Sequence, residues 1–184
     1  MFGMEDFIRK YMSLAVVLLS VTNAQASVDQ FNSTEGNNTI DVMEIKDGKK
    51  ITCEVEKNIR FCKDDKGLPY TGVAYVEYEN NNKQREETYK DGILDGLLTA
   101  YYQNGQLREQ VNYRKGLPEG VAKVYYENSN LKNEITYMNG KLNGITKSYY
   151  EDGSLQKEGV YKDGKLNGYA KTYYKNGQLQ SEEN

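Results

Sequence analysis

Two ladders of glycines divide most of this chain into units of constant length. Gly72 begins the first ladder, Gly92 begins the second, and both advance by 24 residues. The first ladder is Gly72, Gly96, Gly120, Gly144 and Gly168, and the second is Gly92, Gly116, Gly140 and Gly164. A fixed period of this size is typical of repeat proteins, in which one supersecondary unit is stacked many times.

Each unit contains two turn signals. One follows a Tyr-Tyr pair, at Asn104-Gly105, Asn128-Ser129, Asp152-Gly153 and Asn176-Gly177. The other closes the unit, at Asp91-Gly92, Lys115-Gly116, Asn139-Gly140 and Asp163-Gly164. Asn-Gly and Asp-Gly favour two-residue type I′ turns, because both central residues need positive φ. The pattern predicts two strands per unit, with longer or distorted loops at Asn128-Ser129 and Lys115-Gly116.

Two-residue turns fix the strand register. A turn at Asn104-Gly105 would pair Tyr102 with Leu107 and Gly96 with Tyr113 on one face of a hairpin. Cross-strand pairs between aromatic and aliphatic side chains stabilise a sheet. We interpret the first glycine ladder as leaving room for the tyrosine rings of the neighbouring strand.

The opposite face carries a second repeating set of side chains. A tyrosine recurs there once per unit, at Tyr101, Tyr125, Tyr149 and Tyr173, and Arg108 and Lys132 are expected beside this row. The register also sets Lys123 opposite Glu134, Lys147 opposite Glu158 and Lys171 opposite Glu182. Exposed ion pairs of this kind are weak, so the charges indicate a solvated face. A phenol offers apolar area together with a polar tip, which makes the row a candidate binding surface.

The unit "DGKLNGYAKTYYKNGQL" and its variants resemble the MORN repeat in its bacterial variant form. The spacing of tyrosine, glycine and turn glycine is matched at Tyr89 and Gly96, and again in each later unit. The resemblance implies an all-β fold, an elongated single-sheet antiparallel meander of tandem hairpin repeats over residues 67–184. It also implies that the chain holds partners rather than catalysing a reaction.

The two cysteines lie before the repeats, in residues 41–66. If Lys57-Asn58 forms a two-residue turn, Cys53 lies opposite Cys62 as a non-hydrogen-bonded pair, which is the closer kind of cross-strand neighbour. That spacing suits a disulfide. The chain has two Cys and no His. A zinc or redox site would need more of these residues. We therefore expect a disulfide-stapled cap hairpin, and no metal or cofactor.

The first residues have the features of an export signal. Arg9 and Lys10 precede an apolar run, and Ala24-Gln25-Ala26 supplies a cleavage pattern of small residues. We expect residues 1–26 to be a signal peptide and residues 27–40 to be a disordered polar lead-in. The expected location is the periplasm, the cell envelope or the outside of a bacterial cell, where a disulfide persists.

Composition excludes several classes of function. The chain has no His and no Trp, which removes Ser-His-Asp triads. The formal net charge is −3, so the chain lacks the excess of positive charge that nucleic-acid binding needs. The same charge argues against binding of anionic membrane lipid. Carboxylates such as Glu109, Glu134 and Glu158 recur once per unit, whereas catalysis needs one asymmetric site. We therefore expect no enzymatic activity.

The function predicted from these observations is an exported repeat scaffold with a protein partner. A carbohydrate-binding module that uses the tyrosine row is one alternative. An antitoxin-like or immunity-like neutralising protein is another. Residues Leu179, Gln180, Ser181 and Glu182 are expected on the last strand, whose open edge could pair with a partner strand or a second copy of the chain.

Overall fold

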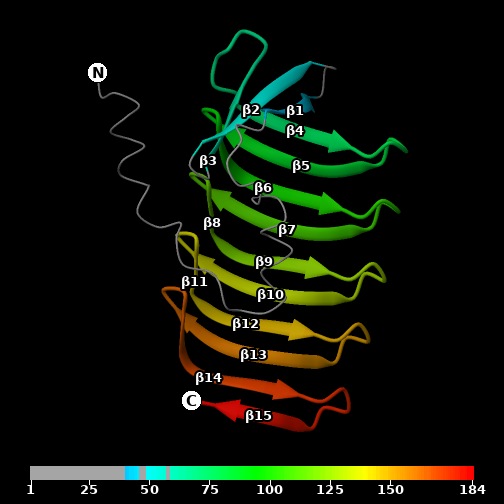
Figure 1. Ribbon diagram of the computed structural model, residues 1–184, viewed down its shortest axis with the longest axis vertical. Helices are drawn as coiled ribbons and strands as arrows, with labels where there is room; N and C mark the ends of the chain where they lie inside the picture. Colours follow the sequence, from blue (N-terminus) through cyan, green and yellow to red (C-terminus); the bar gives the residue numbers. More distant parts are fainter. Residues whose placement is uncertain (1–39, 46–48, 57–58) are drawn as a thin grey trace.

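A computed structural model describes residues 40–45, 49–56 and 59–184. The expected export signal and most of the expected lead-in lie outside these residues, as does the Lys57-Asn58 turn. No helix occurs in the described part of the chain, so none of it could cross a membrane as a helix. The described residues instead form one antiparallel sheet of 15 strands (Figure 1).

From residue 72 onward the strands follow one another along the long axis of the molecule, whereas the first three strands cross its upper end (Figure 1). Their bounds are β1 (Ile40–Ile45), β2 (Lys50–Glu56), β3 (Ile59–Lys63), β4 (Gly72–Glu77), β5 (Lys83–Lys90), β6 (Ile93–Tyr101), β7 (Leu107–Arg114) and β8 (Leu117–Pro118). Then come β9 (Gly120–Tyr125), β10 (Leu131–Met138), β11 (Lys141–Leu142), β12 (Gly144–Tyr149), β13 (Leu155–Lys162), β14 (Lys165–Tyr173) and β15 (Leu179–Glu183). The predicted all-β meander of hairpin repeats is confirmed.

The turns that close the units have the predicted geometry. Asp91 and Gly92 both have positive φ, 51° and 80°, as a type I′ turn requires. Lys115 and Gly116 have nearly the same values, 52° and 79°. The distortion expected at Lys115-Gly116 is therefore wrong, because a lysine adopts the left-handed conformation here when a glycine follows it.

The turns after the Tyr-Tyr pairs are different from the prediction. Only Gly105 of the Asn104-Gly105 pair has positive φ, and Gly105 N–H donates to the Tyr102 carbonyl at 2.9 Å. Tyr102 N–H in turn donates to the Gln106 carbonyl at 2.8 Å, so the loop is longer than two residues. A bulge follows, and Leu107 pairs with Tyr101 instead of Tyr102.

All of these loops share one geometry, including the one at Asn128-Ser129 for which a distortion was expected. Ser129 adopts a φ of 68° and takes the place of the glycine. Ser129 N–H donates to the Tyr126 carbonyl at 2.9 Å, as its counterpart does in the other units. The loop at Asn128-Ser129 is therefore longer than a two-residue turn, as expected, but it is no more distorted than its counterparts in the other units.

The glycines of the first ladder lie at bends of the strands. Gly96 has a φ of 132°, and the pairing of β5 with β6 shifts register between Glu87 and Tyr89. A Cβ atom at Gly96 would lie 2.8 Å from the Cβ of Thr88. The interpretation that these glycines make room for a tyrosine ring is wrong for Gly96, because the nearest atoms belong to Thr88 of β5 and not to Tyr113, the tyrosine that pairs with Gly96.

The cap strands cross over the first repeat instead of extending the sheet beyond it. β1 pairs with β4 at Ile45 and Ala74, and β3 meets β6 at Phe61 and Ile93. Strands β1 to β6 therefore form a closed ring of neighbours. The space inside the ring is filled by one buried cluster of Met43, Ile51, Cys53, Cys62, Ala74 and Tyr89.

The predicted disulfide joins Cys53 and Cys62, whose Cα atoms are 4.0 Å apart. The backbone of Cys62 points away from β2: its N–H donates to the Gly92 carbonyl at 2.8 Å, and its carbonyl accepts from Tyr70 N–H at 3.0 Å. This confirms a non-hydrogen-bonded pair. The bridge therefore joins β2 to β3 through side chains, while the backbone of β3 at Cys62 hydrogen-bonds to residues outside β2.

Removal of the disulfide should destabilise this end of the molecule. The bridge closes a loop with a sequence separation of 9. A Cys53→Ala, Cys62→Ala double variant should lose about 2 to 4 kcal/mol of unfolding free energy, since its unfolded chain is less constrained. Urea unfolding followed by circular dichroism measures the difference. An unchanged unfolding free energy would show that packing and ion pairs alone hold the cap.

Candidate functional site

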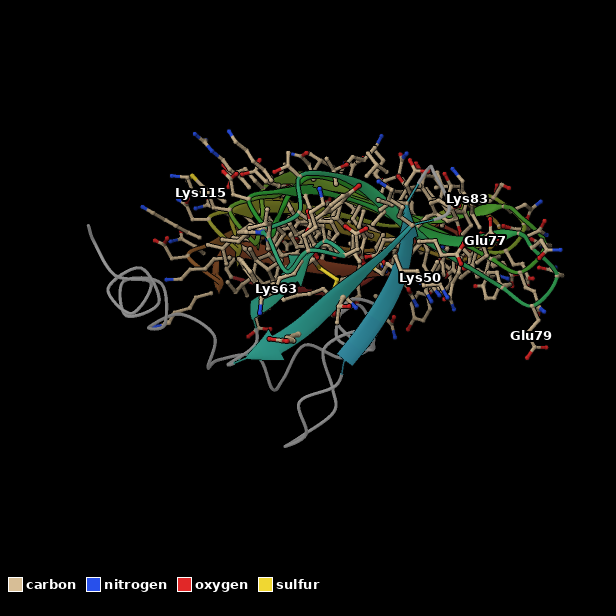
Figure 2. The ribbon with its side chains drawn as sticks, turned by 90° about the horizontal axis from the view of Figure 1, so that it is seen from above. Lys50, Lys63, Glu77, Glu79, Lys83 and Lys115 are labelled. Atoms are coloured by element: carbon tan, nitrogen blue, oxygen red, sulfur yellow. A yellow bond between two sulfur atoms is a disulfide. The ribbon has the colours of Figure 1, made fainter. Side chains whose placement is uncertain are left out.

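The sheet has two unlike faces, which we call the capped face and the open face. The capped face lies under β1–β3 and carries Ala74 and Tyr89. The open face carries Val73, Tyr75 and the residues that follow them at the repeat period. Figure 2 looks along the long axis and shows the cap strands and the disulfide on one side of the sheet only. The open face therefore runs from β4 to β15 without the cap over it.

A line of exposed aliphatic side chains follows the open face from repeat to repeat. It consists of the residue directly after each of the first four ladder glycines: Val73, Leu97, Val121 and Ile145, which are 43%, 47%, 50% and 47% exposed. We call these four residues the apolar stripe. Tyr169 occupies the same position in the last unit. Single exposed aliphatic residues are ordinary on protein surfaces, but these four recur at one fixed position along the sheet. Thr88, Asn112 and Thr136 lie on the strands between them, opposite Val73, Leu97 and Val121.

Two of the polar side chains next to the apolar stripe are turned toward the backbone. Thr88 Oγ1 donates to the carbonyl of Leu97 at 3.0 Å, and Thr136 Oγ1 donates to the carbonyl of Ile145 at 2.9 Å. These hydroxyls are therefore already hydrogen-bonded within the sheet. The stripe was not predicted from the sequence, although the apolar residue after each ladder glycine was a readable signal.

The predicted tyrosine row is present on the open face but is partly buried. Tyr101, Tyr125, Tyr149 and Tyr173 are each of intermediate exposure. Tyr173 donates its hydroxyl to Glu158 Oε1 at 3.0 Å. Lys132 does not serve this row directly, since its Nζ lies 5.3 Å from the centre of the Tyr126 ring. Arg108 likewise lies near Tyr102, where its charge partly offsets the rise in the pKa of that phenol caused by burial.

The second tyrosine of each Tyr-Tyr pair connects one repeat to the next. Tyr102 donates its hydroxyl to the Tyr125 carbonyl at 2.6 Å, and Tyr126 donates to the Tyr149 carbonyl at 2.7 Å. Tyr78 and Tyr150 make the same bond to the residue 23 positions later. This role was not predicted from the sequence. These tyrosines are structural, and the carbonyls they bond belong to residues of the tyrosine row in four successive units.

The predicted edge residues lie on β15, which pairs only with β14 among the described strands. All five residues of β15 are exposed, and Leu179 is 51% exposed. The predicted pairing of Lys171 with Glu182 is confirmed, with Nζ and Oε1 3.4 Å apart. Whether this edge associates with a partner strand stays a prediction.

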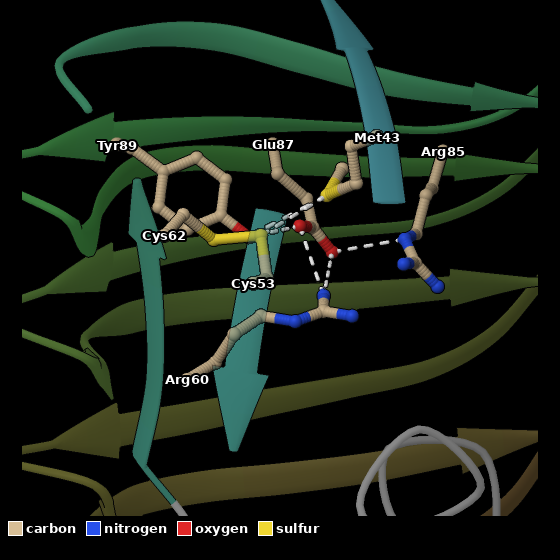
Figure 3. The surroundings of a disulfide bond; sticks show 7 residues. All are labelled: Met43, Cys53, Arg60, Cys62, Arg85, Glu87 and Tyr89. Atoms are coloured by element: carbon tan, nitrogen blue, oxygen red, sulfur yellow. Dashed lines mark hydrogen bonds and ion pairs between the residues drawn. A yellow bond between two sulfur atoms is a disulfide. The ribbon is translucent and has the colours of Figure 1, made fainter. Parts of the chain in front are cut away.

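Charged residues on the capped face hold the cap in place (Figure 3). Arg60 of β3 contacts both carboxylate oxygens of Glu87 at 3.1 Å, and Arg85 Nε lies 3.1 Å from Glu87 Oε1. The Tyr89 hydroxyl also donates to Glu87. Burial, followed by the Glu87 charge, raises the pKa of Tyr89, so this phenol stays protonated. The buried carboxylate is paired with cations, as a stable interior requires.

The three carboxylates considered for catalysis are not equivalent. Glu134 and Glu158 lie on the open face opposite Lys123 and Lys147. Glu109 lies on the capped face, because it is one residue out of step with them and a one-residue offset reverses the face. Their grouping as one residue recurring in every unit is therefore wrong. No group of three or more metal-ligating side chains occurs in the described part of the chain.

Glu109 is the most perturbed acid in this region. Its side chain is buried, and burial raises the pKa of its carboxyl to about 7, although Arg108 opposes the shift. This carboxyl lies on the face away from the apolar stripe and the tyrosine row. Its titration therefore affects the stability of the fold and not the candidate binding surface.

The hydroxyl bonds between repeats should contribute measurably to stability. A Tyr126→Phe variant loses the bond to the Tyr149 carbonyl and should lose about 1 kcal/mol of unfolding free energy. Tyr174 is the matched control, since it is 50% exposed and makes no such bond to the described residues. Chemical denaturation of both variants tests this assignment. Equal losses from Tyr126→Phe and Tyr174→Phe would contradict it.

Glu109 should make the protein less stable as pH rises. In the unfolded chain its carboxyl ionises near the ordinary value of 4.5, whereas in the folded chain it ionises near pH 7. The unfolded state thus holds fewer protons between these values, and the stability present below pH 4.5 is lost as pH reaches 7. The loss amounts to about 3 kcal/mol. A Glu109→Gln variant should lack this part of the pH dependence in urea unfolding, and identical pH profiles would refute the assignment.

Comparisons with known proteins assign the repeats to a family. A comparison with curated proteins finds no match. Among solved structures, the chain is similar to one described as "Crystal structure of GtfA/B complex bound to UDP and GlcNAc", at 16% identity and a TM-score of 0.26. That alignment covers 61% of this chain and only 23% of the other. The family model of the MORN repeat variant matches residues 94–115, 118–139, 142–163 and 166–184. Residues 94–184 therefore consist of four tandem repeats of the MORN repeat variant family.

Proposed function

We propose that this repeat scaffold is a non-enzymatic, exported protein that binds a protein partner along its open face. The observation that carries the proposal is the apolar stripe, which exposes one aliphatic side chain per repeat in four successive units. A surface of this kind costs solubility when it is left uncovered, and such surfaces mark interaction sites on other proteins. Aliphatic residues repeated along one axis suit an extended partner better than a small molecule.

The distribution of carboxylates supports a binding role over catalysis. Acid catalysis by two carboxylates needs both in one site, with environments that separate their pKa values. Glu109 is buried on the capped face, and Glu134 and Glu158 lie on the open face opposite lysines. An activity abolished by changing one glutamate would contradict this part of the proposal.

Export is supported by the disulfide at the cap. Structural disulfides persist in oxidising compartments and are rare in the bacterial cytosol. The bridge joins two buried cysteines that pack beside Met43, so it has the surroundings of a structural bond. The periplasm, the cell envelope and the exterior all satisfy this condition.

The tyrosine row supports a second candidate, in which the partner is a polysaccharide. Its four rings recur once per repeat on the open face at intermediate exposure. Aromatic side chains at regular spacing can stack against sugar rings. A glycan array that binds the intact chain, but not a Tyr125→Ala, Tyr149→Ala double variant, would favour this candidate over a protein partner.

The proposed protein partner can be tested by capture from cell-envelope extract followed by cross-linking and mass spectrometry. A Val121→Lys variant places a charge in the middle of the apolar stripe and should lose the partner. The matched control is Leu68→Lys, because Leu68 is 58% exposed and lies outside the stripe. Cross-links should map to the open face. Equal capture by both variants would refute binding through this face, and cross-links to β15 would direct attention to the edge.

A further inference from the structure

We infer that the apolar stripe is the docking surface for an acidic amphipathic helix of a partner protein, lying along the long axis of the sheet. One apolar side chain of the helix contacts each repeat. The inference rests on the proposed function and specifies the shape and the charge of the partner. Four observations carry it: exposure of the stripe, its spacing, the pairing of the sheet backbone, and the charges that flank the stripe.

The spacing of the stripe matches one heptad of an α-helix. Successive stripe residues lie two strands apart, and strands in a sheet are about 4.8 Å apart, so the repeat distance is about 9.6 Å. Seven residues of an α-helix rise about 10.5 Å. Side chains on one face of an extended strand recur at about 6.6 Å, which does not match. A helix with an apolar residue once per heptad therefore remains close to register from Val73 to Ile145.

The backbone of the sheet also favours a helix. The stripe lies on the face of the sheet, where strands β4 to β13 have their backbone groups directed at neighbouring strands. An extended partner crossing this face would have its own N–H and C=O groups left without partners, which is costly when they are removed from water. A helix satisfies these groups internally and offers only side chains.

The charges beside the stripe are positive on one side. Lys90 lies two residues after Thr88 on the same face. The corresponding residues in later units are Arg114, Met138 and Lys162. All four are exposed. Lys90, Arg114 and Lys162 form no ion pair with the residues that the structure describes. Met138, at 46% exposure, widens the apolar surface between them.

The other side of the stripe is close to neutral. Lys123, Lys147 and Lys171 each lie opposite a glutamate on the neighbouring strand. The turn edge also carries the carboxylates of Asp95 and Glu119, which accept hydrogen bonds from the N–H groups of Lys115 and Asn139. The positive charge toward this edge comes from Lys90, Arg114 and Lys162, together with Lys115 (Figure 2). A partner helix with acidic residues next to its apolar positions complements this arrangement. Its affinity should fall with rising salt, because these charges are exposed.

The test uses the full chain and synthetic helical peptides of four heptads, about 28 residues. The first peptide has one Leu per heptad with Glu at the flanking positions. The second has the same composition with Leu at every fifth residue, and the third has Lys in place of Glu. Fluorescence anisotropy should show binding of the first peptide, with at least about tenfold weaker binding of the other two.

Variants of the chain complete the test. A Leu97→Ser, Ile145→Ser double variant should weaken binding of the first peptide by about tenfold or more, whereas Leu68→Ser should not change it. A Lys90→Glu, Lys162→Glu variant should weaken binding and flatten its salt dependence, with Lys66→Glu as the matched control. Circular dichroism establishes that each variant is folded.

Several results would overturn the inference. Equal affinity for the two leucine spacings would refute the heptad match, and equal affinity for the Glu and Lys peptides would refute the charge match. Dimers of the free chain that are lost in the Leu97→Ser, Ile145→Ser variant would assign the stripe to a second copy. If no peptide binds but capture from extract still depends on Val121, the inference fails while the proposed function stands.

Discussion

Hydrogen bonds between successive repeats hold this chain in its extended shape. A single hairpin is marginally stable in water, and here each hairpin is bonded to the next at both of its ends. At the turn edge, Gly116 N–H donates to the Leu94 carbonyl at 2.8 Å and Gly140 N–H donates to the Pro118 carbonyl at 3.0 Å. At the opposite edge, the second tyrosine of each pair supplies the bond. Each repeat thus satisfies polar groups that its neighbour would otherwise leave unpaired.

Different residue types meet the same need in different repeats. In three of the closing turns, the N–H of the first residue donates to a side-chain oxygen 20 residues earlier: Asp91 to Thr71, Lys115 to Asp95 and Asn139 to Glu119. The fold requires only an oxygen at this position. The sequence can therefore vary between units while the backbone keeps its period. The apolar stripe has no comparable duty toward the backbone, so its regularity suggests a constraint from outside the chain.

Most of the fold could be predicted from the sequence, because turn chemistry and a period of two strands per unit determine the register. The pairing of Gly96 with Tyr113 and of Cys53 with Cys62 follows from this reasoning. The bulge at Tyr101 could not be predicted, since Asn-Gly is compatible with more than one loop geometry and only the backbone dihedrals distinguish them. The crossing of β1–β3 over the sheet depends on contacts distant in sequence, such as the bond between Arg60 and Glu87. The candidate surface was predicted only in part: the tyrosine row was expected, whereas the stripe was not. The apolar residue after each ladder glycine was readable in the sequence, but how far its side chain is exposed depends on the twist of the sheet.

The closed ring of β1 to β6 makes the two ends of the molecule mechanically unequal. Strands within the ring are constrained by neighbours far away in sequence and by a covalent bridge, whereas the repeats beyond it contact only the units next to them. In such an array, cooperativity decays with distance, and local opening needs to break only nearest-neighbour interfaces. The ring therefore holds the first strands rigidly in place. The remaining sheet can change its twist to fit what binds along it. A ligand that binds across several repeats would reduce the motion of these repeats relative to one another and extend the rigid region from the ring toward β15.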